Sequence, residues 1–244
     1  DNLEEVVSNS DVTMVARGDL GVEVAYEQLV YWQKRIIDLC RQQGKPVITA
    51  TEMLKSMVEK PRPTRAEISD VAHAIYDGTD AIMLSDETTS GKYPLKAVQT
   101  QATIAAYNEP HAVIPMIEHT TKSWSNTLSA SVITLLKQEP EEIKYIVCLT
   151  ETGRTAQLLA SYHPDVPVIA VTSSDVVARQ LSVVYGVQAL VSNMEQGSTL
   201  SAEKVLYALQ QAKIGKTGDK VIMLYGPVWQ EAHETNTVSV GTLL

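Results

Sequence analysis

Short apolar runs alternate with stretches of helical period along the first part of the chain. Three runs of apolar and β-branched residues predict strands at Val12–Val15, Pro46–Ala50 and Asp80–Leu84. Apolar residues three or four positions apart predict helices over Ala25–Cys40, from the Thr64–Glu67 capping box to Gly78, and over Pro94–Tyr107. This alternation is typical of parallel strands joined by crossover helices in α/β proteins.

The pattern breaks between Asn108 and Met116, where two prolines interrupt any regular element. We therefore expect one domain at residues 1–107 and a second at residues 108–244. After a helix over Trp124–Lys137, the second domain is predicted to contain strands at Tyr145–Leu149, Val168–Val171, Val187–Val191, Val221–Leu224 and Thr237–Val240. Helices near 155–162, 175–185 and 200–213 separate the first four strands, which predicts a small open sheet.

Composition narrows the class of protein. The 244 residues are 44% hydrophobic and 20% charged, which is ordinary for a globular chain with a real core. The net charge of −9, without a basic stripe, argues against nucleic acid as a partner. No apolar run reaches the roughly 18 residues of a transmembrane helix, so we expect no membrane partner.

The two cysteines and the first residues bear on compartment and completeness. Cys40 and Cys148 each lie in an apolar stretch, so we expect buried reduced thiols rather than a disulfide, and a cytoplasmic location. The chain starts at Asp1 without a targeting pattern or an initiator methionine. We therefore expect it to be a piece of a longer protein.

Polar residues follow each of the first three predicted strands. These segments are Ala16–Gly21, Thr51–Glu52 and Ser85–Thr88. In parallel α/β architectures the carboxyl ends of strands lie at one edge of the sheet, where sites are built. Turn formation and helix capping explain any one of these segments, but three in register favour a site.

The first of these segments contains Arg17-Gly18-Asp19. Gly18 allows the backbone to bend, so that neighbouring N–H groups can face an anion. Asp19 provides a hard carboxylate oxygen of the kind that Mg²⁺ prefers. The tripeptide alone is weak support, and an integrin-recognition role would need an exposed extracellular loop rather than the end of an apolar strand.

Several long motifs make the chain resemble the pyruvate kinases. They span residues 14–23, 44–54, 60–67, 77–88 and 91–94, in the order and spacing of that family. The resemblance covers the whole chain and implies the last three β/α units of a TIM-type (β/α)8 barrel, followed by an open α/β C-terminal domain. On this resemblance, the first five barrel strands and the cap domain of the family are expected to lie outside this chain. The resemblance implies that the catalytic lysine, the second Mg²⁺ carboxylate, the K⁺ site and most nucleotide contacts of the family lie outside it too.

The resemblance implies transfer of a phosphoryl group from phosphoenolpyruvate to ADP, giving pyruvate and ATP in glycolysis. It also implies Mg²⁺ or Mn²⁺ and K⁺ as cofactors, a homotetramer and an allosteric phosphorylated effector. This piece alone would be incomplete as an enzyme. The alternative is a non-catalytic module for oligomerisation or for binding a phosphorylated metabolite.

Matching motifs assign roles to individual residues. Asp19 matches the Mg²⁺ ligand, and the backbone of Ala16, Arg17 and Gly18 matches the segment that holds the phosphoenolpyruvate carboxylate. Thr51 matches a threonine that touches this carboxylate and relays a proton to the enolate. Two further polar residues line the proton-delivery side in the family, and they match Ser85 and Glu87.

One position between these two residues departs from the family. Asp86 stands where the family usually has glycine. If that glycine has a positive φ, aspartate would be strained there, although it tolerates this region better than most residues. We therefore expect some backbone strain and an added carboxylate near the proton path.

Two further segments are predicted to contact other molecules. Arg62 and Arg65 lie in a proline-flanked loop, which is either simply solvated or, by resemblance, part of the large subunit interface. The Thr150–Thr155 segment joins a predicted strand to a helix and offers hydroxyls and N–H groups to a phosphate. The family binds sugar-phosphate effectors there, which implies roles for Thr150, Thr152, Gly153, Arg154 and Thr155; a plain threonine helix cap is the alternative. Glu151 and the segment 229–236 depart from versions that bind fructose bisphosphate.

Overall fold

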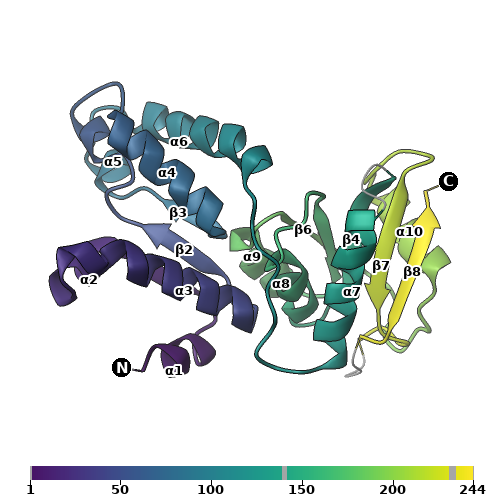
Figure 1. The fold of residues 1–244 in the computed structure, drawn as a ribbon. Helices are drawn as coiled ribbons and strands as arrows, with labels where there is room; N and C mark the ends of the chain where they lie inside the picture. The colour runs from purple at the N-terminus through teal and green to yellow at the C-terminus, as the bar shows by residue number, and fades with distance from the viewer. Residues whose placement is uncertain (1, 139–141, 231–234, 244) are drawn as a thin grey trace. The chain divides into compact units, whose positions relative to one another are not determined.

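The computed structural model describes residues 2–138, 142–230 and 235–243. The chain divides into two compact units, residues 1–118 and residues 119–244. The boundary expected at 107/108 marks the end of α6 (Pro94–Asn108), and the segment 109–118 groups with the first unit. Each unit is an α/β body with its own sheet (Figure 1).

The sheet of the first unit has three parallel strands in the order β1-β2-β3. The strands are β1 (Thr13–Ala16), β2 (Val47–Ala50) and β3 (Ala81–Met83), and all three were predicted. The register aligns Ala16 with Ala50 and Ala50 with Met83. The residues that follow these three therefore leave the sheet at the same edge.

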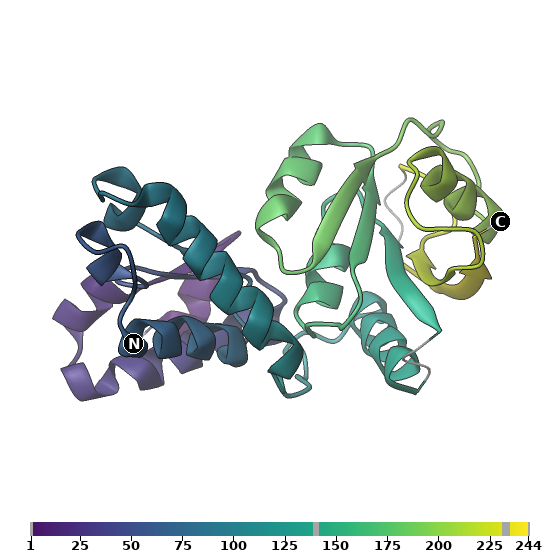
Figure 2. The same cartoon turned by 90° about the horizontal axis from the view of Figure 1, so that it is seen from above.

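Helices α3 (Leu29–Gln43), α4 (Arg65–Asp77) and α6 connect and follow these strands. Gly44 ends α3 with φ 60°, and Gly78 ends α4 with φ 83°, conformations that glycine adopts without strain. The predicted capping box is present, because the Thr64 side chain accepts from the N–H of Glu67 while the Glu67 carboxylate accepts from the N–H of Thr64. α4 and α6 lie side by side (Figures 1 and 2).

Several helical segments of the first unit differ from the prediction. The helix expected from Ala25 begins at Leu29, after a 3₁₀ turn at Tyr26–Gln28. The segments expected as loops after β1 and β3 contain α2 (Arg17–Glu23) and α5 (Asp86–Thr89), and α1 (Leu3–Ser8) was not predicted. Two glycines lower the helix propensity of α2, and α1 and α5 are too short to show a period.

The second unit has a five-stranded open sheet in the order β6-β5-β4-β7-β8. Its strands are β4 (Ile143–Leu149), β5 (Val168–Thr172), β6 (Val187–Val191), β7 (Lys220–Tyr225) and β8 (Thr237–Thr242). Only β8 is antiparallel to its neighbour among these strands. All five were predicted, and β7 and β8 lie side by side in Figure 1.

The helices of this unit are α7 (Trp124–Gln138), α8 (Arg154–Ala160), α9 (Asp175–Gln180) and α10 (Ala202–Gln211). The helix expected up to residue 185 instead ends as a 3₁₀ turn at Leu181–Val183. Buried residues of β4, β5 and β7 pack with α10 residues such as Val205 and Leu209 into the core of this unit. The hydrophobic core of the second unit is thus formed mainly between buried strands of the sheet and the amphipathic helix α10.

Cys40 and Cys148 are both buried free thiols, as predicted. Burial raises the pKa of Cys40 to about 11 and that of Cys148 to about 12. Both groups are therefore protonated and unreactive at neutral pH. Across the described residues, no helix is both long and apolar enough to cross a bilayer.

Candidate functional site

A backbone-to-side-chain hydrogen bond joins the segments that follow β1 and β2. α2 starts directly after β1, and the N–H of Gly18 in its first turn donates to Oγ1 of Thr51, at 2.8 Å. Asp19, the next residue, is exposed in the same turn. The structure therefore brings together three residues that the matching motifs assign to one site: Gly18, Asp19 and Thr51.

Thr51 and Glu52 both have left-handed backbone conformations. Their φ angles are 70° and 55°. This region is costly for a β-branched residue, by about 1–3 kcal/mol, and persists where surrounding contacts enforce it. The strain lies at the residue whose hydroxyl was predicted to act on the substrate, which is typical of functional sites.

The Arg17 side chain is buried and engaged within the protein. Its Nη1 donates to both carboxylate oxygens of Asp70, each at 2.6 Å. Its Nε lies 3.2 Å from the carbonyl oxygens of both Ala50 and Thr51. Because the guanidinium is occupied by these partners, a substrate at this position would contact the backbone of Ala16, Arg17 and Gly18, as the motif implies. No sequence motif indicated a role for Asp70.

Glu87 is fully buried, and both of its carboxylate oxygens accept hydrogen bonds from the backbone. The N–H of Leu54 donates to one oxygen at 2.9 Å, and the N–H of Ser85 donates to the other at 2.8 Å. The carboxylate therefore joins the segments after β2 and β3. The role predicted for Glu87 and Ser85 on the proton-delivery side stays a prediction; Ser85 itself is partly exposed.

Replacing Glu87 with glutamine is expected to lower the free energy of unfolding by about 1–3 kcal/mol. The amide offers a single acceptor oxygen, so one backbone N–H is left facing an NH₂ group. Urea unfolding followed by circular dichroism measures the loss. Glu59→Gln, at an exposed ion pair with Lys92, is the matched control and should change stability by less than about 1 kcal/mol. Equal losses of unfolding free energy in the two variants would show that the Glu87 carboxylate does not hold the two segments together.

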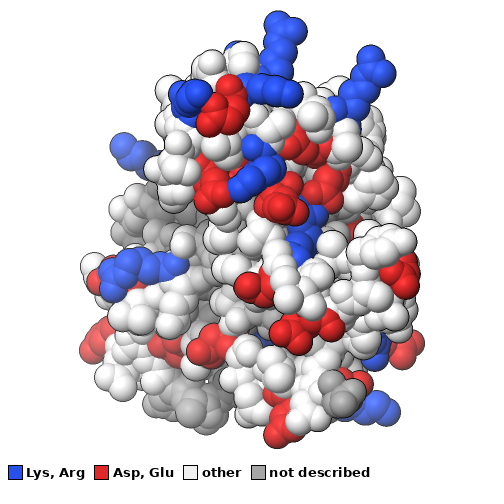
Figure 3. Space-filling view, turned by 90° about the vertical axis from the view of Figure 1, so that its left-hand side faces the viewer, with Lys and Arg blue, Asp and Glu red and all other residues white. Residues whose placement is uncertain are grey.

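Asp86 is not strained, which corrects the expectation for this position. It begins α5 and does not have a positive φ. Its exposed carboxylate forms an ion pair with Lys55, and this hydrogen bond raises the pKa of Lys55. The added charge near the site is therefore balanced by a cation from the segment after β2. On the face drawn in Figure 3, Lys and Arg side chains are likewise interspersed with Asp and Glu.

The Asp19 carboxylate suits a metal ion whose remaining ligands come from the substrate and from water. Among the described residues, no group of three His, Cys, Asp or Glu side chains could hold a metal ion. Mg²⁺ commonly takes one or two protein carboxylates and fills its remaining positions with water and substrate oxygens. The exposed carboxylate of Asp19 fits that use, beside backbone N–H groups that suit an anion.

Arg62 and Arg65, the predicted interface residues, are both exposed. Arg65 is the first residue of α4, directly after the Thr64 cap, and Arg62 precedes it in the loop. Their position on the surface is compatible with contact to another subunit.

In the second unit, four predicted effector residues line one cavity of about 460 Å³: Thr150, Thr152, Arg154 and Thr155. Gly153 forms the turn at the start of α8 with φ 83°, and its N–H donates to Oγ1 of Thr150 at 3.0 Å. A Cβ at Gly153 would lie 3.1 Å from Cδ2 of Leu181. Burial lowers the pKa of Arg154, which remains a cation at neutral pH.

The lining of this cavity also includes Trp229 and Thr235, and Oγ1 of Thr235 lies 3.2 Å from Oγ1 of Thr155. Of the divergent segment 229–236, residues 231–234 lie outside the described residues. Glu151 also lines the cavity and accepts a hydrogen bond from Ser173 at 2.7 Å. Among the described residues, the lining thus combines hydroxyls and a cation with one carboxylate, that of Glu151.

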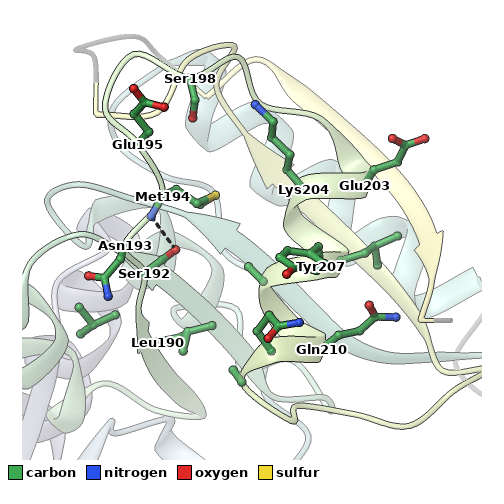
Figure 4. Close-up of a pocket in the computed structure, with 15 residues that line it drawn as sticks. Leu190, Ser192, Asn193, Met194, Glu195, Ser198, Glu203, Lys204, Tyr207 and Gln210 are labelled. Carbon is green, nitrogen blue, oxygen red and sulfur yellow. Dashed lines mark hydrogen bonds between the residues drawn. The ribbon is translucent and has the colours of Figure 1, made fainter.

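A larger, mainly apolar groove of about 1050 Å³ was not predicted. It lies between α10 and the segment after β6, and its lining includes Leu190, Met194 and Tyr207 (Figure 4). These residues are separated in sequence and face one another only after α10 packs on the sheet. No motif could have revealed the groove.

The two units define an α/β protein with barrel-type β/α units and a separate open-sheet domain. The family model "Pyruvate kinase, barrel domain" matches residues 1–98, and "Pyruvate kinase, alpha/beta domain" matches residues 125–241. The chain belongs to the pyruvate kinase family, and its fold is part of a (β/α)8 barrel followed by the α/β domain.

Curated relatives agree with this assignment. A pyruvate kinase of Clostridium acetobutylicum is 44% identical, over 98% of this chain and 51% of the relative. Pyruvate kinases of Sporosarcina psychrophila and Staphylococcus aureus are 42% and 43% identical, each over 98% of this chain and 42% of the relative. The chain therefore spans about half the length of the curated relatives it matches.

Proposed function

We propose that the intact protein transfers the phosphoryl group of phosphoenolpyruvate to ADP, giving pyruvate and ATP. The observation that carries this proposal is the meeting of Gly18, Asp19 and Thr51 at the strand ends, in a chain of the pyruvate kinase family. A backbone N–H, a carboxylate and a hydroxyl there suit an anionic substrate bound with Mg²⁺.

Mg²⁺ or Mn²⁺ at Asp19 would neutralise charge on the transferred phosphoryl group. The carboxylate of Asp19 would hold the metal, and the backbone of Ala16–Gly18 would orient the carboxylate of the substrate. The K⁺ ion and the nucleotide require further residues that the matched motifs do not provide.

Thr51 and Ser85 would serve the protonation of the enolate. The Thr51 hydroxyl accepts from Gly18, so its own proton remains available to a substrate atom. The N–H of Ser85 donates to the Glu87 carboxylate, which joins the segments after β2 and β3. The buried Glu87 carboxylate would hold these two segments on the proton-delivery side.

The remaining roles are those of the second unit, the interface and the cell compartment. We place a phosphorylated effector in the cavity at Thr150–Thr155, and a subunit contact of a homotetramer at Arg62 and Arg65. Two buried reduced cysteines support a cytoplasmic protein.

A lactate-dehydrogenase-coupled assay tests the activity in the intact protein and in this chain. Turnover by the intact protein, with little or none by residues 1–244 alone, is the expected result. Absence of turnover in both would favour the alternative, a non-catalytic module that binds a phosphorylated metabolite through the 460 Å³ cavity.

Binding at that cavity is testable without catalysis. A ligand that binds only the folded state, at a concentration of 100 times its Kd, raises the free energy of unfolding by about 2.7 kcal/mol. We expect fructose bisphosphate, ribose 5-phosphate, AMP or glucose 6-phosphate to raise the melting temperature of the chain. Thr152→Asp, which places a negative charge beside the ligand, should abolish that rise.

Thr121→Asp adds the same charge at an exposed position outside the residues that line the cavity, and it should keep the rise. If no sugar phosphate shifts the melting temperature at millimolar concentration, the turn is a helix cap. The same conclusion follows if the Thr152 variant responds like the parent.

A further inference from the structure

Asp70, in the middle of α4, is joined to the first residue of α2. Both of its carboxylate oxygens accept from Nη1 of Arg17, each at 2.6 Å. The Arg17 side chain is 9% exposed and that of Asp70 is 35% exposed. The pair is therefore shielded from water on the arginine side, where removing one partner is costly.

The rest of the Arg17 guanidinium holds the backbone where the chain leaves β2. Nε lies 3.2 Å from the carbonyl oxygens of Ala50 and Thr51, and Nη2 also donates to that of Thr51. Nη2 further lies 2.9 Å from Sδ of Met53. All three guanidinium nitrogens are thus used to connect Asp70 with the segment 50–53.

This is the segment in which Thr51 and Glu52 have left-handed backbones. A threonine does not retain that conformation without external contacts, and the carbonyl of Thr51 is fixed by Arg17. The conformation places Oγ1 of Thr51 2.8 Å from the N–H of Gly18. The position of the hydroxyl therefore depends on the arginine, and the arginine depends on its carboxylate partner.

We infer that Asp70 is a positioning residue for the proton-transfer step, acting through Arg17 on Thr51. The inference rests on the proposed function. Without the carboxylate, the guanidinium loses its ionic partner and is drawn toward water, which releases the carbonyl of Thr51. The backbone then relaxes toward negative φ, and the hydroxyl leaves its place beside Gly18.

Amide hydrogen exchange of Gly18, measured by NMR on this chain, tests the structural part. Asp70→Asn keeps the shape of the side chain but removes its charge, and it should speed exchange at Gly18 by about tenfold or more. Asp77→Asn is the matched control, because Asp77 lies on the same helix but pairs with Lys34 and Gln33. Equal exchange rates at Gly18 in the two variants would overturn the inference.

Exchange of the pyruvate methyl protons for deuterium, catalysed by the intact protein, tests the functional part. Asp70→Asn should slow this exchange by about 10- to 100-fold, and Asp77→Asn by less than about twofold. In a Thr51→Val background, Asp70→Asn should add less than about twofold, because the hydroxyl on which it acts is already gone.

The outcomes separate this inference from the proposed function. A parent protein that exchanges no pyruvate protons and makes no ATP contradicts the proposed function and, with it, the role of Asp70 in catalysis. If the parent is active but the losses of proton-exchange rate from the Asp70 and Thr51 substitutions multiply in the double variant, the inference alone is contradicted. A purely structural loss at Asp70 would act independently of Thr51 in this way. Melting curves of all variants identify any that fail to fold. Asp70→Glu retains the negative charge, so it should recover more exchange activity than Asp70→Asn.

Discussion

Replacing Asp19 with alanine in the intact protein is expected to lower kcat/KM by about 100- to 1000-fold or more. Asp19 is the exposed carboxylate in the first turn of α2, beside the backbone that would hold the substrate. Without it, Mg²⁺ binds more weakly, and the charge that develops during phosphoryl transfer is less well neutralised. Steady-state kinetics over a range of Mg²⁺ concentrations measures the loss.

Glu23→Ala is the control for this prediction. Glu23 is the last residue of the same helix, and it is also an exposed carboxylate. It should leave kcat/KM within about twofold of the parent, because surface substitutions away from a site have small effects. An Asp19→Ala protein with activity within tenfold of the parent at ordinary Mg²⁺ would remove Asp19 from the site.

Thr51→Val is expected to lower kcat by about 100-fold while changing the KM for phosphoenolpyruvate much less. Valine keeps the β-branched shape and removes the hydroxyl, so the strained backbone is retained while the proton relay is lost. An interaction made mainly in the transition state affects kcat rather than ground-state binding.

Thr51→Ser keeps the hydroxyl and should retain a kcat within about tenfold of the parent. Initial-rate kinetics at saturating ADP separates kcat from KM for the three proteins. A Thr51→Val enzyme with a raised KM and an unchanged kcat would show that the hydroxyl binds the substrate without taking part in the proton transfer.

Local patterns were sufficient to predict the strands and most helix ends. The parallel strands β1–β3 and the helices closed by Gly44 and Gly78 follow from apolar periodicity and from glycine at the C-terminal cap. α2 was missed because Gly18 and Gly21 disfavour a helix, and its formation depends on the contacts at the edge of the sheet.

The candidate site was predicted in part, because its motif residues are close in sequence to the strand ends. The contact between Gly18 and Thr51 follows from the register of β1 and β2. The pairing of Arg17 with Asp70 could not be predicted, since it joins residues 53 positions apart in sequence and has no periodic signature. The enclosed position of Glu87 likewise depends on the packing of the segments after β2 and β3.

Asp86 shows how a single departure from a motif can mislead. Its replacement of the usual glycine suggested a positive φ, yet the residue lies in a right-handed helical turn. The ion pair with Lys55 then balances its charge. Backbone conformation cannot be inferred from the identity of the residue that another protein has at the same position.

The most direct test of the proposed activity is ³¹P NMR of the intact protein with phosphoenolpyruvate, ADP, Mg²⁺ and K⁺. We expect the phosphoenolpyruvate resonance to disappear while the γ-phosphate resonance of ATP grows in equal amount. A phosphoenolpyruvate resonance that persists, or one that is replaced by inorganic phosphate without ATP, would show that the intact protein does not transfer the phosphoryl group to ADP.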